Sequence, residues 1–173
     1  VGLRGPVLRG WAVVLEVLPQ EDPDDAGRLV LGAFPGGERY RKHLLDLDGL
    51  GVRDLCPDGD DLLVLAGPSM ALSGPVRVYR WHGAAVTDTS RVVRGAELTR
   101  ELDLAHGAGE DHAEGIALLD PSASHRLLVV YDSPAPARRP TEHTVLADRV
   151  ALLPFVARNG TPVSQRVTTE SVP

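Results

Sequence analysis

The stretch GEDHAEGIALL, residues 109–119, carries the densest group of side chains able to do chemistry in this chain. Glu110, Asp111, His112 and Glu114 lie between two glycines, directly before an apolar run. Their carboxylates and imidazole are donors that bind divalent cations. Asp111 and Glu114 could instead act as general acid and base if one were desolvated. A structural interpretation stays open beside both, because Glu114 could also accept backbone N–H groups of a neighbouring strand.

Arginines far from this stretch offer a complementary chemistry. Arg4 and Arg53 carry planar guanidinium groups that bind carboxylates or phosphates through paired hydrogen bonds, and the neighbouring pair Arg138 and Arg139 could do the same. A structural role is equally consistent with the sequence. Arg4 and Arg53 could join neighbouring units through salt bridges, with Asp54 as the ion-pair partner of Arg53.

These observations define the candidate ligand-binding residues: Arg4, Arg53, Asp54, Asp111, His112, Glu114 and Asp132. Three of them, Asp111, His112 and Glu114, form the candidate metal site, with a divalent cation such as calcium as the expected ion. No catalytic residue is assigned. The sequence contains no G-x-S-x-G nucleophile elbow, no P-loop and no dinucleotide-binding fingerprint.

Short apolar runs separated by glycine and proline predict that strands, not helices, position these residues. One unit of four runs is complete, at Val52–Leu55, Leu62–Ala66, Val76–Trp81 and Leu98–Leu104. We name the strands of such a unit a, b, c and d in chain order. The residues DGDDL between a and b predict a hairpin turn.

Two further units have the same order but are incomplete. The later unit has a, b and c at Gly115–Leu119, Leu127–Tyr131 and Val145–Leu152. The earlier unit has b in VGLRGP, c in WAVVLEV and d in YRKHLLDL, whose ending LDL matches the ending of LTRELDL. The run Arg28–Phe34 is either an additional strand or the true strand d of the earlier unit.

Four antiparallel strands per repeat without intervening helices predict an all-β fold, a fragment of a β-propeller with about two and a half blades in an incomplete ring. A β-sandwich is the alternative, since it also has many short strands. Because a propeller protects its sheet edges by closing the ring, we expect a longer protein. Residues 1–156 are then the C-terminal part of the propeller, and the polar residues 157–173 are a flexible tail.

In a propeller, the connections from d to the next a and from b to c emerge on one face. The d–a connections contain DLDGLGVRD and AHGAGEDHAEG, and the b–c connections contain RGPVLRG, GPSMALSGP and DSPAPARRP. These polar, glycine- and proline-rich segments should gather at one mouth of the ring. Loops held by a rigid scaffold commonly carry binding residues.

The segments GLRGPVLRGWAVVLEV, GLGVRDLCPDGDDLLVLAGPSMALSGPVRVYRW and GEDHAEGIALL…LLVVYDSP together resemble a bacterial family known only as a domain of unknown function. The resemblance spans Gly2 to about Leu153 and implies a propeller-like fold within a longer protein. The pair Glu114–Gly115 is also similar to the "EG" signature of phytase-like and esterase-like propellers. The first resemblance implies no activity.

Composition excludes several partners. The formal net charge of −6 argues against nucleic acid, because phosphate contacts need clustered Lys and Arg. No apolar run has the length of a membrane span, and no signal peptide is visible. Because the start of the protein is expected to be missing, the absence of a signal peptide carries little weight, and the location is left unknown with the cytoplasm favoured. The single cysteine, Cys56, excludes an internal disulfide.

Two functions fit these features. The first is a module that binds a small molecule or another protein through the loops at the mouth. The alternative is a metal-assisted hydrolase that acts on a phosphate or an ester, in which metal-activated water is the nucleophile. The sequence leaves open whether the protein is an enzyme.

Overall fold

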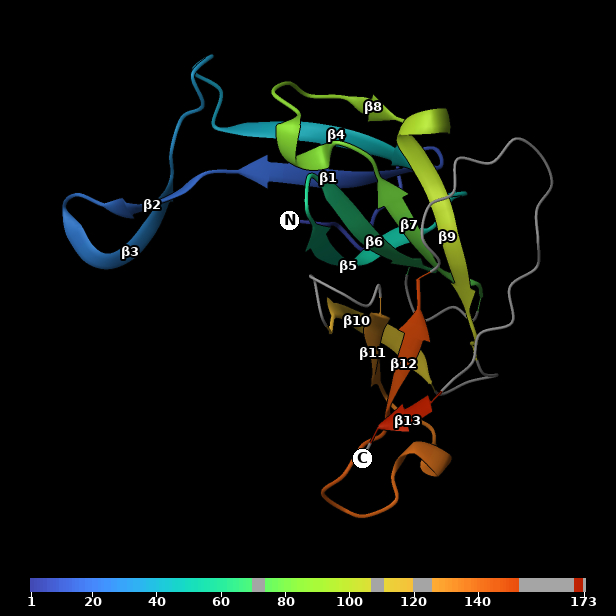
Figure 1. The fold of residues 1–173 in the computed structure, drawn as a ribbon. Helices are drawn as coiled ribbons and strands as arrows, with labels where there is room; N and C mark the ends of the chain where they lie inside the picture. Colours follow the sequence, from blue (N-terminus) through green and yellow to red (C-terminus); the bar gives the residue numbers. More distant parts are fainter. Residues whose placement is uncertain (70–73, 107–110, 120–125, 153–169, 173) are drawn as a thin grey trace.

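The computed structural model describes residues 1–69, 74–106, 111–119, 126–152 and 170–172 (Figure 1). Within this part of the chain the fold is all-β, with several small sheets and no α-helix, and it is consistent with a fragment of a β-propeller. Three short 3-10 helices lie between strands: η1 (Ala84–Val86), η2 (Gly95–Glu97) and η3 (Pro136–Arg138). None of the described helices is long and apolar enough to cross a membrane.

The middle sheet has four antiparallel strands, β5 (Gly51–Asp58), β6 (Asp61–Gly67), β7 (Val76–Trp81) and β9 (Leu98–Leu104), in this spatial order. This is the complete unit a to d predicted from the sequence. The predicted hairpin turn between a and b is confirmed, because Asp58 pairs with Asp61 and Gly59 adopts a positive φ of 60°.

The last sheet continues the pattern with β10 (His112–Leu118), β11 (Arg126–Asp132), β12 (Ala147–Ala151) and β13 (Glu170–Val172). Strands β10, β11 and β12 are the predicted a, b and c. The predicted flexible tail, residues 157–173, lies outside the described residues except for β13, which pairs with β12.

The first sheet contains β1 (Trp11–Val17), β4 (Tyr40–Asp46) and the short β8 (Val92–Val93), which pairs with β4 in parallel. Val1 and Leu3 hydrogen-bond to the other edge of β1, as expected for strand b of this unit. The true strand d is β4.

The remaining two strands are β2 (Pro19–Asp22) and β3 (Asp25–Leu31). They form a separate hairpin, which lies between β1 and β4 in the sequence. The run Arg28–Phe34 is therefore an additional strand, and the suggestion that it forms strand d was wrong. In Figure 1 this hairpin projects away from the sheets. Its residues are largely exposed, so packing against the core cannot specify it.

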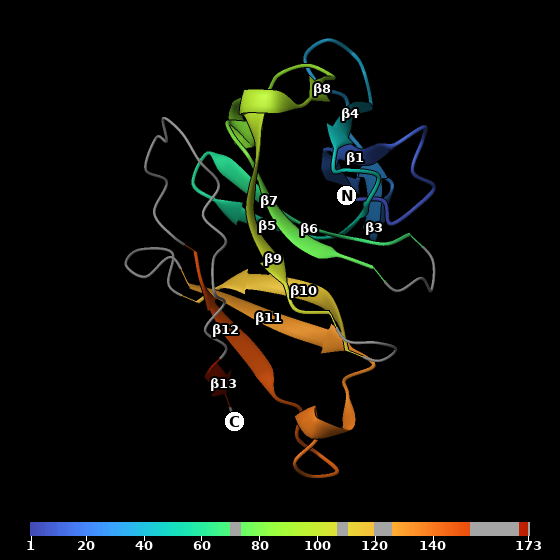
Figure 2. The same ribbon diagram turned by 90° about the vertical axis from the view of Figure 1, so that its right-hand side faces the viewer.

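The three sheets are stacked, with the β5–β9 sheet in the middle (Figure 2). Leu63 and Leu65 of β6 pack into a core shared with the last sheet, whereas Val64 and Ala66 pack into a core shared with the first sheet. The middle sheet is therefore buried on both faces, which explains why β6 reads as a continuous apolar run. A two-layer β-sandwich buries only one face of each sheet, so that alternative was wrong.

One buried histidine leads us to expect that the stability of this packing depends on pH. The His43 side chain is 2% exposed, its ring lies 4.9 Å from the ring of Trp81, and burial lowers its pKa although Glu16 opposes the shift. Because the pKa is lower in the folded state, the unfolded chain takes up the proton first as the pH falls. The stability contributed by neutral His43 is complete above its unfolded pKa and is lost as the pH falls through the folded pKa.

We therefore expect the free energy of unfolding to decrease below about pH 6.5, with a slope from this group of at most about 1.4 kcal/mol per pH unit. The variant His43→Phe keeps a ring beside Trp81 and removes the titrating group. Urea unfolding at a series of pH values measures the difference between the two proteins. A difference that stays constant from neutral to acid pH would contradict the assignment.

Candidate functional site

Two residues of the candidate site occupy equivalent irregularities in successive sheets. The pairing of β5 with β6 shifts register between Val52 and Asp54, so that Arg53 is an extra residue in β5. The pairing of β10 with β11 shifts in the same way at Glu114. A β-bulge redirects the side chain of the extra residue. In both sheets, the bulge in strand a therefore turns a charged side chain away from the direction that the regular alternation of the strand would give it.

These redirected side chains meet each other. Arg53 donates from Nη1 to Oε1 of Glu114, and Nη2 of Arg4 lies 3.2 Å from the same oxygen. Arg53 also donates from Nη2 to the carbonyl of Pro68 at 3.2 Å. We call the region formed by the starts of β5 and β10 and the ends of β6 and β11 the mouth. The structure thus brings together Arg4, Arg53 and Glu114, which lie far apart in the sequence.

The three side chains differ in burial. The Arg53 side chain is 0% exposed, Glu114 is 21% exposed and Arg4 is 48% exposed. Burial lowers the pKa of Arg53, while the charges of Glu114 and Asp132 raise it and that of Arg4 lowers it. Arg53 is therefore a buried cation that depends on Glu114, and Arg4 is the guanidinium that solvent reaches.

Two glycines make room for this arrangement. A Cβ atom on Gly67 would lie 2.1 Å from Nε of Arg53, and one on Gly51 would lie 2.0 Å from the backbone oxygen of Arg4. Any side chain at either position would displace an arginine of the cluster. Nε of Arg53 has no hydrogen-bond partner among the described residues, which agrees with Gly67 covering it.

Asp54 joins two sheets and does not pair with Arg53. Its Oδ2 accepts a hydrogen bond of 2.7 Å from the backbone N–H of Ile116 in β10, and its Oδ1 accepts one from Leu55 at 2.8 Å. A Cβ on Gly115 would be 3.7 Å from Oδ2. The carboxylate that fixes a neighbouring strand a is therefore that of Asp54, whereas the sequence suggested Glu114 for this role.

Asp111 is bound by an arginine. Arg138 donates from Nε to both carboxylate oxygens, at 2.7 and 2.8 Å, and the backbone N–H of Ala135 donates at 3.2 Å. The other end of Arg138 forms a paired contact with Asp148 at 2.7 and 2.8 Å. The guanidinium carbon also lies 3.8 Å from the ring centre of Tyr131. Asp111 and Arg138 therefore fasten the loop between β11 and β12.

His112 and Asp132 are cross-strand partners at the start of β10 and the end of β11, so both lie at the mouth. Asp132 is exposed and His112 is partly buried. A hollow of about 470 Å³ lies at this end of β11, and its lining includes Asp132, Ser133 and Arg139. Glu110, the first acidic residue of the cluster, lies outside the described residues.

The candidate metal ligands are placed in different surroundings. Glu114 is held by Arg53 and Arg4, and Asp111 by Arg138, so these carboxylates are already neutralised by arginines. The described ranges contain no group of three or more His, Cys, Asp or Glu side chains that could hold a metal ion. The arrangement is suited to charge pairing and to contact with an anion.

Two residues that organise the end of the last sheet, Asp148 and Tyr131, were not predicted from the sequence. Asp148 of β12 is buried and binds both Arg138 and the hydroxyl of Tyr131, which donates at 2.6 Å. Burial raises the pKa of Tyr131 and the hydrogen bond to Asp148 raises it further. A charged residue inside the predicted strand of residues 145–152 was the available signal, because buried carboxylates require a partner.

The comparisons with known proteins agree with the predicted resemblance to a family of unknown function. A family model described as "Protein of unknown function (DUF3616)" matches residues 1–148. No curated protein and no solved structure matches the chain. Because the family model covers well over half of its length, the chain belongs to the DUF3616 family of proteins of unknown function.

Proposed function

We propose that this protein is a ligand-binding module whose mouth holds a small polar molecule by an anionic group, either a carboxylate or a phosphate. One observation carries the proposal: two guanidinium groups share a single carboxylate oxygen of Glu114, and the one on Arg4 is half exposed. Arg4 is then the residue that contacts the ligand, while Arg53 and Glu114 hold it in position.

The charges of the cluster support an anion as the ligand. Arg53 is fully buried, and the buried guanidinium needs the negative charge of Glu114. The same carboxylate therefore cannot fully neutralise Arg4. Among the described residues Arg4 pairs with Glu114 alone, through one of its nitrogens. A guanidinium has five N–H donors, and a planar anion can use two of the remaining donors together.

A hollow at the same mouth supports a small-molecule ligand, since its lining includes Asp132, whose charge also acts on Arg53, although Arg4 is not part of the lining. Its volume of about 470 Å³ falls within the usual range for small-molecule sites, roughly 300–1,000 Å³. Arg139 supplies a second cation in its lining, and Asp132 supplies an acceptor for hydroxyl or amine groups. A metal-assisted hydrolase has less support, because the carboxylates it requires are bound to arginines.

The test is isothermal titration of the full-length protein with inorganic phosphate and, separately, with acetate. We expect at least one of these anions to bind, with an affinity that falls as sodium chloride is added. Arg4→Gln should weaken the binding at least about tenfold, because a charge-assisted contact is lost.

Arg94→Gln is the matched control, since Arg94 is an exposed arginine that precedes η2 and the start of β9, at the end of the middle sheet opposite the mouth. Its anion affinity should equal that of the unchanged protein. The proposal fails if neither anion binds, or if Arg4→Gln and Arg94→Gln have the same affinity.

A further inference from the structure

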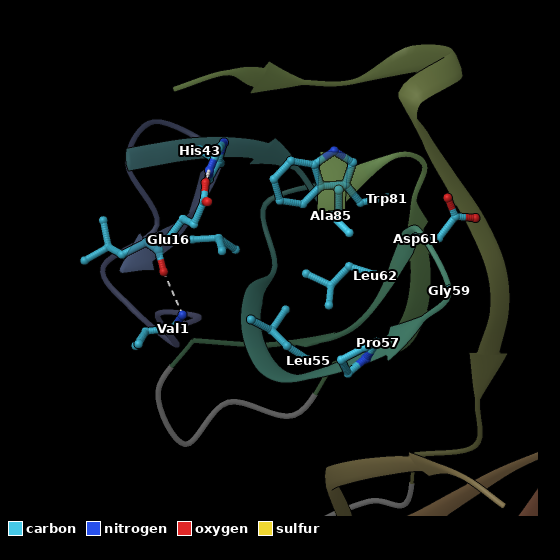
Figure 3. A pocket seen from close by; sticks show the side chains of 13 residues that line it. Val1, Glu16, His43, Leu55, Pro57, Gly59, Asp61, Leu62, Trp81 and Ala85 are labelled. Carbon is cyan, nitrogen blue, oxygen red and sulfur yellow. Dashed lines mark hydrogen bonds and ion pairs between the residues drawn. The ribbon is translucent and has the colours of Figure 1, made fainter. Parts of the chain in front are cut away.

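A second hollow lies at the other end of the middle sheet. It has a volume of about 240 Å³ and lies between the first sheet and the β5–β6 hairpin (Figure 3). Its lining includes Leu55 and Leu62, together with Trp81 from β7 and Ala85 from η1. Arg53, by contrast, lies at the mouth end of β5. The two sites are therefore separate.

The walls of this hollow are mainly apolar, with one ionised group on one side. In Figure 3 Leu55, Leu62 and Trp81 surround the space, and Glu16 and His43 lie on the side opposite Leu62. Asp61 also belongs to the lining, but in this view its carboxylate points away from the space. The Glu16 carboxylate is thus the charge that a bound molecule would meet.

Glu16 is held in place by residues behind it. Its Oε2 lies 3.3 Å from Nε2 of His43, and its Oε1 accepts a hydrogen bond of 3.3 Å from Nη1 of Arg41. Arg41 also donates from Nε to Oε1 of Glu38 at 3.2 Å, so its single positive charge is shared between two carboxylates and does not fully neutralise Glu16. A carboxylate has about four acceptor positions, so the contacts with His43 and Arg41 leave room for another donor. The Glu16 side chain is 38% exposed, and the lining contains no lysine or arginine side chain among the described residues.

The backbone next to Glu16 is already satisfied. The backbone nitrogen of Val1 reaches the lining too, but it donates to the carbonyl oxygen of Leu15 at 2.7 Å and is thereby directed at the β1 backbone (Figure 3). The apolar walls and the remaining acceptor capacity of Glu16 together define what fits: an apolar body with one donor group at its end.

We propose that this hollow binds a small molecule with one apolar ring and one protonated amine. The ring packs between Leu55, Leu62 and Trp81, and the ammonium group donates to Glu16. The volume of the hollow sets the size of the molecule that it can bind. A dry apolar cavity of about 150 Å³ accepts benzene, so about 240 Å³ accepts one ring with a short side arm.

Phenethylamine, 2-phenylethanol and 3-phenylpropionate are suitable probes, because they carry the same ring with a positive, neutral or negative end. The full-length protein with Trp11→Phe retains Trp81 as a tryptophan in the wall of the hollow, and its fluorescence reports binding. We expect saturable binding of phenethylamine, at least tenfold tighter than that of either other probe. Absence of a saturable response, or equal or tighter binding of 3-phenylpropionate, would overturn the proposal.

Two variants locate the bound molecule. Ala85 and Ala96 are both exposed and are the middle residues of η1 and η2, but of the two only Ala85 lines the hollow. Ala85→Phe should weaken phenethylamine binding at least tenfold, and Ala96→Phe should leave it unchanged. Equal effects of both variants would contradict the location.

A third variant, Glu16→Gln, tests the amine contact. It tests the proposal by itself if Ala85→Phe does not fold. Glu16→Gln should reduce the preference for phenethylamine over 2-phenylethanol to less than threefold. A preference that remains at tenfold in Glu16→Gln would show that Glu16 does not bind the amine.

Discussion

Replacing Leu65 with asparagine is expected to lower the free energy of unfolding by about 4 kcal/mol, and replacing Val64 with asparagine by about 3 kcal/mol. Both side chains are fully buried, although they point to opposite faces of β6. Each substitution removes buried apolar surface and leaves an amide without a partner in a packed core. Urea unfolding followed by circular dichroism measures both losses.

Leu29→Asn provides the control, because Leu29 is 67% exposed on the projecting hairpin. Its effect should stay within about 0.5 kcal/mol. If only one of the two β6 substitutions were costly, one face of the middle sheet would be solvated, and the stacking of three sheets would be incorrect.

Replacing Glu114 with alanine is expected to destabilise the fold by about 3 kcal/mol. The substitution leaves the fully buried guanidinium of Arg53 without its counter-charge, and a buried charge without a partner is strongly unfavourable. Pairing the change with Arg53→Met should recover most of the lost stability, because the uncompensated charge is then removed as well.

The matched control for this prediction is Glu142→Ala, which removes an exposed carboxylate from the β11–β12 connection. We expect a change of less than about 0.5 kcal/mol in the free energy of unfolding from this control. If Glu114→Ala behaved in the same way, the Arg53–Glu114 pair would contribute nothing to the fold.

The sequence predicts the middle sheet well because strong local signals agree there. Strands β7 and β9 have the bounds predicted for c and d, at Val76–Trp81 and Leu98–Leu104. Their apolar residues are bounded by glycine, proline and charged residues, which mark where strands end. Strand β8 was missed because it has two residues, Val92 and Val93, and pairs in parallel with β4, which no local pattern reveals.

The candidate site was predicted in outline but not in its contacts. Repeat order placed Arg4, Arg53 and Glu114 at one mouth, and the structure brings them together. The bulges at Arg53 and Glu114 could not be predicted, because a bulge depends on the register of the partner strand.

The partner of Asp111 could not be predicted from the sequence either. Arg138 lies 27 residues further along the chain, in a loop whose path is set by tertiary packing. The sequence alone does not distinguish a carboxylate that binds a metal ion from one that is bound by an arginine. The contact with Arg138, at 2.7 and 2.8 Å, is what distinguishes them.

The most direct test of the account is the coupling energy between Arg53 and Glu114, which are 61 residues apart in the sequence. A double-mutant cycle with Arg53→Met, Glu114→Ala and the combined variant measures it from three free energies of unfolding. If successive sheets direct these residues to one mouth, the coupling should be about 2 kcal/mol. Effects that add to within about 0.5 kcal/mol would show that the two side chains do not meet, and would contradict the account.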